Sequence, residues 1–390
     1  MSAQIRVLQV ISSLGMGGVE TWLMEVLRLW SKDGSAHMDF LATSGKRDLF
    51  DDEAGSLGAH IYYVPSQRGH LLRFAREFRG LLRAGQYDAI HDHEHRTSGW
   101  HFLMGTGLLP PVRVTHMHDL NKGGVTLGRR VTARVGRSLA ARYSTHILGT
   151  SRQVIEQNGF NASQFRALPE AALYCGFDPA RFMGDAAAEK VSVCTELGWP
   201  ENAKIILSVG RIDQSPDVGH LQNHKNSAFA LGVGIECARR DSRMHLLFAG
   251  ALSPAVSTFQ QRVSAAGCAG RIHFAGIRQD IPRLMLASDA LLFPSVWEGL
   301  GMAAVEAQAA GLPVLASTAV PRECVVVPEL VRFQKLEAGP SEWATELIEL
   351  MATHPDRFQA NQQVAASDFA LQNSARALLS LYSTGALARS

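Results

Sequence analysis

The sequence has few cysteines, and they show no pattern. Five are present among 390 residues, an odd number, and no two have the close spacing of a metal-binding pair. They are Cys175, Cys194, Cys237, Cys268 and Cys324. This excludes a disulfide framework and a cysteine-rich zinc site, and we expect reduced thiols, as in a cytosolic protein.

Long apolar runs are also missing. No segment reaches the ~18 consecutive apolar residues of a membrane-spanning helix. Residues 1–11 contain no apolar segment behind a basic one, so we interpret them as a first strand and not as a signal peptide. We therefore expect a cytoplasmic location, with peripheral attachment to the inner face of the cytoplasmic membrane as an open alternative.

A strong excess of either charge is absent too. The formal net charge is +2, with 46% hydrophobic and 19% charged residues. This balance is typical of a soluble globular protein and argues against nucleic acid as a partner. Residues 1–170 hold 20 Lys and Arg against 15 Asp and Glu, so the first half is the basic one. A chain of 390 residues is longer than one hydrophobic core ordinarily serves, so we expect two domains.

Short apolar runs alternate with helix-length intervals along the whole chain. They fall at 5–12, 37–44, 60–66, 87–93, 112–118 and 145–150, and again at 204–210, 244–251, 271–276, 290–293, 313–317 and 331–334. This alternation predicts an α/β fold with mostly parallel sheets. Ligands of such sheets bind beyond the carboxyl ends of the strands, so residues that follow the strands are candidates for a site.

The stretch 290–317 carries the clearest chemical signal. A strand leads through a loop with Gly299 and Gly301 into an alanine-rich helix, which Gly311 ends. The first amides of such a helix lack partners, and the helix dipole adds partial positive charge there. This arrangement suits a phosphate group.

Two carboxylates lie in the same stretch, Glu298 on the loop and Glu306 within the helix. A helix that begins near Gly301 places Glu306 ~8 Å along its axis. Alanines surround Glu306, so the backbone there is expected to pack closely, and a buried carboxylate needs hydrogen-bond partners. The hydroxyl pair of a ribose or hexose would supply them. The alternative is that both glutamates are solvated charges.

The spacing Glu-x7-Glu, with Gly-Leu-Gly after the first glutamate, resembles the signature of retaining glycosyltransferases of family 4, which have the GT-B fold. The segments 274–282 and 320–323, with Trp343, resemble the subgroup that builds bacterial exopolysaccharide and capsule. The resemblance covers most of the chain and is strongest at 271–345. It implies two facing Rossmann-like domains with an interdomain cleft.

The resemblance also implies how the chain is divided. Residues 1–175 would form an acceptor-binding domain and residues 176–365 a nucleotide-sugar-binding domain. Residues 366–390 would form a C-terminal helix that crosses back to the first domain. Near the junction the sequence departs from the family pattern, because Cys175 stands where the family has Asn.

A donor site in the second domain follows from the same resemblance. Its residues are Gly210, Arg211, Lys225, Gly299, Leu300, Gly301, Met302 and Glu306, with Gly17 and Gly18 from the first domain. Arg211 and Lys225 would hold the diphosphate. Glu306 would bind the ribose and Glu298 the sugar hydroxyls. Residues 212–224 separate Arg211 from Lys225 by a longer interval than is usual in the family. For Gly17 and Gly18 the alternative is a tight turn that lets helix and strand pack.

Histidines follow two strands of the first half. Positions on a strand alternate faces, so we expect His91, His93 and His95 to share one. We prefer polar residues of the cleft to a zinc site here, and we expect no metal. A second group resembles the family position where a histidine reaches the reacting sugar, with His118 as first choice and His116 as second. The alternative is a structural histidine bonded to backbone.

Two predicted helices of the first half, within 71–83 and 129–143, carry rows of arginine. The rows are Arg73, Arg76, Arg79 and Arg83 in one helix, and Arg130, Arg134 and Arg137 in the other. Basic amphipathic helices bind anionic membranes, and an enzyme with a lipid-linked acceptor needs such a surface. The alternative is two ordinary surface helices.

We therefore predict transfer of a hexose from a UDP- or GDP-sugar to a glycan or polyprenyl-linked acceptor, with retention at the anomeric carbon and without metal or cofactor. The predicted catalytic residues are His118, Glu298, Arg211 and Lys225. Two rivals stay open. One is another GT-B enzyme, such as a nucleotide-sugar 2-epimerase, and the other is a catalytically degenerate scaffold that binds sugar nucleotides.

Overall fold

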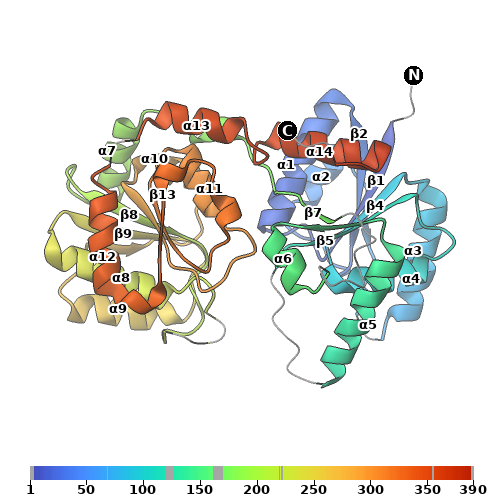
Figure 1. Cartoon of the computed structure of the whole chain (residues 1–390), viewed down its shortest axis with the longest axis horizontal. Helices are drawn as coiled ribbons and strands as arrows, with labels where there is room; N and C mark the ends of the chain where they lie inside the picture. The colour runs from blue at the N-terminus through green and yellow to red at the C-terminus, as the bar shows by residue number, and fades with distance from the viewer. Residues whose placement is uncertain are drawn as a thin grey trace. The chain divides into compact units, whose positions relative to one another are not determined.

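The structure is a computed structural model of the chain (Figure 1). It describes residues 4–67, 69–119, 127–160, 170–218, 220, 223–353 and 355–387. The chain divides into two compact units. Unit 1 consists of Met1–Phe177 together with Asp368–Ser390, and unit 2 consists of Asp178–Ser367. The changes between units fall two residues after those proposed from the sequence, at 175 and 365.

Unit 1 is built on a parallel sheet of seven strands. They are β1 (Ile5–Ile11), β2 (Ala36–Ala42), β3 (Ile61–Tyr63), β4 (Ala89–Asp92), β5 (Val112–Met117), β6 (His146–Gly149) and β7 (Glu170–Ala172). Their order is β3-β2-β1-β4-β5-β6-β7. The sequence did not predict β7, because its three residues carry no strand signature and become a strand by pairing with β6.

Helices cover both faces of this sheet. They are α1 (Gly18–Asp33), α2 (Asp51–Ser56), α3 (Leu71–Gly85), α4 (Ser98–Gly105), α5 (Leu127–Tyr143), α6 (Arg152–Gln157) and α14 (Leu371–Thr384). On one face, Phe74 of α3 packs in a core with Leu8 and Val10. Gln9 lies between these two on the strand and bonds Tyr382 of α14, so α14 covers the opposite face.

The last helix belongs to unit 1 although unit 2 precedes it in the chain. The Phe177 amide donates to the Phe369 carbonyl at 3.0 Å, and the Leu371 amide donates to the Phe177 carbonyl at 2.8 Å. The Trp22 indole of α1 donates to Ser374 of α14 at 3.0 Å. These bonds fasten α14 to the segment after β7 and to α1.

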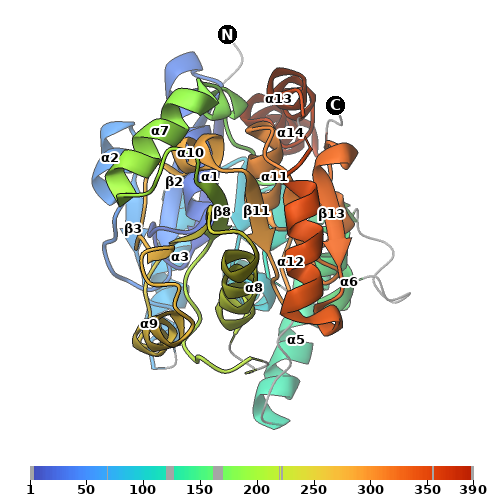
Figure 2. The same cartoon turned by 90° about the vertical axis from the view of Figure 1, so that its left-hand side faces the viewer.

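Unit 2 is built on a parallel sheet of six strands (Figure 2). They are β8 (Lys204–Val209), β9 (Met244–Ala249), β10 (Ile272–Phe274), β11 (Ala290–Phe293), β12 (Val314–Ser317) and β13 (Val331–Gln334), in the order β10-β9-β8-β11-β12-β13. The helices are α7 (Ala186–Leu197), α8 (Ser227–Arg240), α9 (Ala255–Ala265), α10 (Ile281–Ala287), α11 (Met302–Ala309), α12 (Gly339–Leu350) and α13 (Arg357–Ala365). Within the described ranges, no helix of either unit is long and apolar enough to cross a membrane.

The strand order reverses at one point in each sheet. The reversal lies between β1 and β4 in unit 1 and between β8 and β11 in unit 2. Loops on either side of such a point leave in opposite directions and open a crevice beyond the carboxyl ends of the strands. The predicted site residues follow these strands or their neighbour β5. The topology therefore gives each unit one place for a site.

Candidate active site

In unit 2 the backbone after β8 is shaped around a lysine. Gly210 has φ 139°, and a Cβ built there would meet Lys225 Cε at 2.9 Å. The conformation favours glycine, and the missing side chain leaves room for the lysine to lie across the strand end. The sequence analysis named both residues for the donor site, and the structure places the Lys225 side chain against Gly210.

Asp213 holds the turn that presents this lysine. Its carboxylate accepts from the amides of His224 at 3.0 Å, Lys225 at 3.2 Å and Ser227 at 2.8 Å. Asn226, with φ 58°, then begins α8. One buried carboxylate thus fixes three amides of this turn and sets the direction of Lys225.

Lys225 forms an ion pair with the first glutamate of the Glu-x7-Glu motif. Its Nζ lies 2.7 Å from Glu298 Oε1, and Ser295 Oγ donates to the same oxygen at 2.7 Å. The Lys225 side chain is 29% exposed and that of Glu298 is 13% exposed. Lys225 Nζ also lies 5.1 Å from the ring centre of Phe293, the last residue of β11. Both charges are therefore held in place while they stay within reach of a ligand.

The helix that follows begins where the sequence placed it. Gly301, with φ 96°, is the N-cap of α11, and a Cβ there would lie 3.0 Å from Val320. The left-handed backbone suits glycine, and it turns the first amides of α11, starting with Met302, away from the helix body. Leu300 differs from the other loop residues, because its side chain is only 4% exposed and packs into the core.

Two further charged residues of unit 2 lack a partner among the described residues. The exposed Arg211 guanidinium makes no hydrogen bond or ion pair with any of them, and the same holds for the partly buried Glu306 carboxylate. Burial raises the pKa of Glu306, while the charges of Arg181 and Lys225 lower it. Unit 2 therefore combines a free cation, a helix N-terminus and a carboxylate that lacks hydrogen-bond donors.

The crevice of unit 1 holds a cluster of histidines from β4, β5 and the residues after them. His91 Nε2 lies 3.1 Å from His116 Nδ1, and His93 Nδ1 lies 2.8 Å from His118 Nε2. Burial lowers the pKa of His91 to about 3. Burial also lowers the pKa of His93, His116 and His118 well below the usual value. The four rings are neutral at physiological pH.

The sequence argument was wrong about His95. β4 ends at Asp92, and His95 begins a short helical turn with φ 56°, so strand alternation does not reach it. His116 joins His91 and His93 instead, with ligand atoms within 4.8 Å of one another. The rings of His91 and His93 stack at 4.2 Å and 23°, and both nitrogens of each ring already lie within hydrogen-bond distance of other side chains. This geometry favours hydrogen bonding over a metal site.

A carboxylate from the first turn of α1, that of Glu20, lies against the glycine loop of unit 1. Gly17 is the N-cap of α1, and a Cβ there would lie 2.2 Å from Glu20 Oε2. Burial raises the pKa of Glu20, its own backbone amide lowers it, and Asp48 raises it further. Glu20 already lies over the start of α1 beside Gly17 and Gly18, which favours hydroxyl groups over phosphate at this loop.

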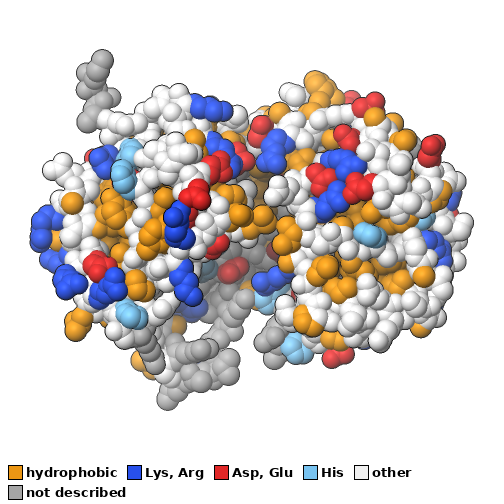
Figure 3. Space-filling view, turned by 180° about the vertical axis from the view of Figure 1, so that it is seen from behind, with side chains coloured by type: hydrophobic (Ala, Val, Ile, Leu, Met, Phe, Trp, Pro, Cys, Tyr) orange, Lys and Arg blue, Asp and Glu red, His pale blue; other side chains and the backbone are white. Residues whose placement is uncertain are grey.

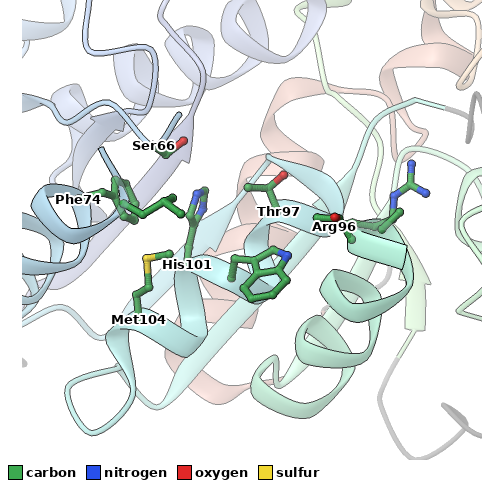
Figure 4. A pocket seen from close by; sticks show the side chains of 10 residues that line it. Ser66, Phe74, Arg96, Thr97, His101 and Met104 are labelled. Atoms are coloured by element: carbon green, nitrogen blue, oxygen red, sulfur yellow. The ribbon is translucent and has the colours of Figure 1, made fainter. Parts of the chain in front are cut away.

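A cavity of about 560 Å³ opens in unit 1 between α3, α4 and α5 (Figure 4). Leu71, Phe74 and Met104 give it an apolar wall, and the Arg96 side chain extends away from that wall. Leu72, next to the wall on α3, is 90% exposed. A space of this size and lining suits an apolar chain.

The arginine row on α3 is smaller than the sequence predicted. Arg79 donates to the carbonyls of Met104 and Thr106 at 3.1 and 2.8 Å, and Arg73 pairs with Glu77 at 2.8 Å. Arg79 therefore fastens the end of α4, and the Arg76 side chain is 80% exposed. Figure 3 shows basic and hydrophobic side chains interspersed over this part of unit 1.

Two family descriptions match the chain, one for each unit. "Glycosyl transferase 4-like domain" matches residues 17–169, and "Glycosyl transferases group 1" matches residues 203–353. Together the two matches place the chain among the glycosyltransferases. Among relatives of this glycosyltransferase, EpsF of Bacillus subtilis is 28% identical over 98% of this chain and 97% of EpsF. The capsular polysaccharide biosynthesis glycosyltransferase CapH of Staphylococcus aureus is 25% identical over 89% and 91%.

Solved structures confirm the GT-B fold of this glycosyltransferase. HepE of Anabaena in complex with UDP and glucose has a TM-score of 0.70, with 18% identity over 98% of this chain and 100% of HepE. A glycosyltransferase from Rickettsia africae has a TM-score of 0.76, with 16% identity over 97% and 98%. The expected pair of Rossmann-like domains is therefore correct.

Several residues that support the site of this glycosyltransferase were missed from the sequence. They are Asp213, Ser295 and Arg181 in unit 2, and Gln9 and Tyr382 in unit 1. An aspartate two residues after Arg211 was a readable signal, since an acidic side chain beside a strand end caps the next turn. For Tyr382 no local signal exists, because it lies 373 residues from Gln9.

Proposed function

We propose that this glycosyltransferase transfers a hexose from a nucleoside-diphosphate sugar to a hydroxyl of a glycan, with retention at the anomeric carbon. The observation that carries the proposal is the set of groups in unit 2. A free guanidinium, the Lys225 ammonium and the first amides of α11 are the groups that bind a diphosphate and stabilise the charge that develops on it as it leaves.

The remaining charges of unit 2 fit the rest of such a donor. The Glu306 carboxylate lacks donors within the described structure, and a ribose hydroxyl pair would supply two. Glu298 forms an ion pair with Lys225, and its carboxylate would accept from the hydroxyls of the sugar. The structure of HepE with UDP-glucose supports a donor of this class.

We propose that the departing phosphate takes the proton of the attacking hydroxyl on the same face of the sugar. This route requires neither metal nor cofactor. It also requires no enzymic nucleophile of the kind that a double displacement uses. His118 of unit 1 would bind a hydroxyl of the reacting sugar.

For the acceptor we propose a lipid-linked glycan in the synthesis of a bacterial surface polysaccharide. The apolar cavity beside α3 and the exposed Leu72 and Arg76 would receive the lipid and face an anionic membrane. Two relatives support this assignment. CapH is named for capsular polysaccharide biosynthesis, and a 63-residue segment is 41% identical to an Escherichia coli galactosyltransferase named for a diphosphoundecaprenol acceptor.

The first experiment measures binding and slow donor hydrolysis with a panel of UDP- and GDP-sugars. One nucleotide series is expected to raise Tm, and its sugar is expected to be released slowly. Arg211→Ala and Glu298→Ala are expected to abolish release. Lys190→Ala is the matched control, because Lys190 pairs with Asp289 at 2.8 Å elsewhere in unit 2. Binding without turnover, with or without an acceptor lipid, would support the scaffold alternative.

A further inference from the structure

The histidines of unit 1 belong to one continuous hydrogen-bonded chain. Gln9 of β1 lies at its centre, between His93 and Tyr382. The distances are 2.9 Å from Gln9 Oε1 to His93 Nε2 and 3.2 Å from Gln9 Nε2 to the Tyr382 hydroxyl. All of these side chains belong to unit 1. Gln9 is the one member whose donor atom and acceptor atom are chemically different, so it sets the direction of the chain.

The first branch runs from Gln9 to His118. The Gln9 carbonyl can only accept, so His93 carries its proton on Nε2 and its Nδ1 is an acceptor. His118 lies 2.8 Å from that Nδ1 through its own Nε2, which must then donate. In a neutral ring this leaves Nδ1 of His118 unprotonated. That atom is buried and makes no hydrogen bond with any described residue.

The second branch runs from Gln9 to His116. The Gln9 amide donates to the Tyr382 oxygen, and the Tyr382 hydroxyl donates to His91 Nδ1 at 2.5 Å. His91 then donates from Nε2 to His116 Nδ1 at 3.1 Å. All four histidines of the two branches therefore carry the proton on Nε2. Burial keeps them neutral, so the direction is preserved.

We propose that Gln9, acting through His93, holds His118 in the Nε2–H tautomer, so that His118 offers Nδ1 as a hydrogen-bond acceptor to a sugar hydroxyl. Gln9 and His93 are positioning residues in this scheme. The assignment of His118 to the sugar rests on the proposed function, whereas its tautomer does not. A histidine at this position is in principle either donor or acceptor, and the chain selects acceptor.

The direction of the hydrogen-bonded chain predicts which groups of a sugar can bind His118. The group that binds His118 must be a donor, which a hydroxyl is and a fluorine is not. Removing that hydroxyl from the donor sugar is therefore expected to lower kcat/KM about as much as replacing it with fluorine. A fluorine that restores the activity lost in the deoxy sugar would indicate that His118 donates, and this would overturn the proposal.

The tautomers are measured directly by 15N-resolved NMR of the imidazoles in the full chain, without substrate. His118 and His93 are expected to show Nε2–H in the unmodified protein, and an Nδ1–H signal from either would overturn the proposal. This result does not depend on turnover, so it separates failure of the tautomer assignment from failure of the proposed function.

Substitution at Gln9 tests whether this residue selects the tautomer of His118. Gln9→Met is expected to leave His118 as a mixture of tautomers and to lower kcat at least about twofold, because only part of the molecules then offer the acceptor. Tyr382→Phe breaks the other branch and is expected to keep His118 as Nε2–H. Thr115→Val removes a buried 2.9 Å bond from the same sheet outside the chain and serves as the stability control. An unchanged His118 signal in Gln9→Met would count against the proposal.

Discussion

The two units arrange their candidate site residues by opposite electrostatic means. In unit 1 four histidines, of which His118 is partly exposed and the others are buried, have lowered pKa values and bind one another as neutral groups. In unit 2 Lys225 and Glu298 form a partly exposed ion pair at 2.7 Å, and Arg211 of the same unit has no partner among the described residues. The residues sit at equivalent places, beyond the carboxyl ends of parallel strands.

This difference indicates what each unit is suited to bind. A neutral chain of hydrogen bonds has a direction but no net charge, so it distinguishes donors from acceptors among hydroxyl groups. Fixed cations and a helix N-terminus have charge and attract an anion of any shape. For the proposed function, this difference suits unit 1 to hydroxyl groups and unit 2 to a diphosphate.

The largest expected effect comes from removing a charge in unit 2. Lys225→Met is expected to lower kcat roughly 10²–10³-fold, because an ammonium that stabilises a departing phosphate is lost. Steady-state kinetics with the donor found in the panel would measure it. Lys190→Met is the matched control and should leave kcat within about twofold. Equal losses in the two variants would mean that Lys225 acts through stability alone.

The next effect is acid sensitivity of unit 1. A histidine whose folded pKa is lowered stabilises the fold above its unfolded pKa and loses that stabilisation as the pH falls toward the folded pKa. His91, lowered from 6.5 to about 3, is expected to cost about 2 kcal/mol between pH 6.5 and pH 5.

Hydrogen exchange corrected for intrinsic rate at each pH would locate this loss. Strands β4 and β5 are expected to open as the pH falls from 6.5 to 5, while the sheet of unit 2 stays protected. The described part of unit 2 contains a single buried histidine, His245. Opening of unit 2 before unit 1 would contradict the prediction.

A smaller loss of kcat/KM is expected when Lys225 is kept and the Asp213 carboxylate, which holds its turn, is removed. Asp213→Ala leaves three amides without their acceptor, so Lys225 loses its fixed direction, and kcat/KM should fall about tenfold. Asp185→Ala is a control of the same kind, because Asp185 caps α7 by accepting from Ala187 and Ala188. If both variants lower Tm but neither changes kcat/KM, Asp213 is a cap only.

The smallest expected effect concerns the surface of unit 1. Arg76→Ala is expected to weaken binding to anionic phosphatidylserine vesicles about fivefold, which corresponds to the ~1 kcal/mol that one arginine contributes near such a surface. Arg239→Ala, an exposed arginine on α8 of unit 2, should have no effect. Sedimentation with vesicles at low and high salt would measure both, and binding that does not weaken with salt would argue against the docking surface.

Much of the fold could be predicted because its signals are local. Apolar runs at regular intervals identified both sheets apart from β7, and the glycines around Glu298 located the start of α11 within one residue. Residue spacing does not reveal that Lys225 pairs with Glu298. The pair forms because β8 and β11 are neighbours in the sheet, and the order of the chain does not show this.

The rest could not be predicted, because it depends on contacts between distant parts of the chain. The expectation for His95 assumed that β4 continues, whereas the strand stops at Asp92. Arg79 was taken for a surface charge because the carbonyls that bind it belong to α4 and the residue after it. The interval 212–224 was noted only for its length, although Asp213 within it holds the turn that presents Lys225.

The return of α14 to unit 1 has a consequence for the synthesis of the protein. The ribosome completes unit 2 before it makes Tyr382, and Tyr382 joins the bond chain that starts at Gln9 on the first strand. Unit 1 therefore cannot complete its fold until roughly two hundred further residues have been added, at about 5–20 per second. A chain that stops short of α14 would have a finished unit 2 and an exposed face on the sheet of unit 1, and quality control could recognise that face.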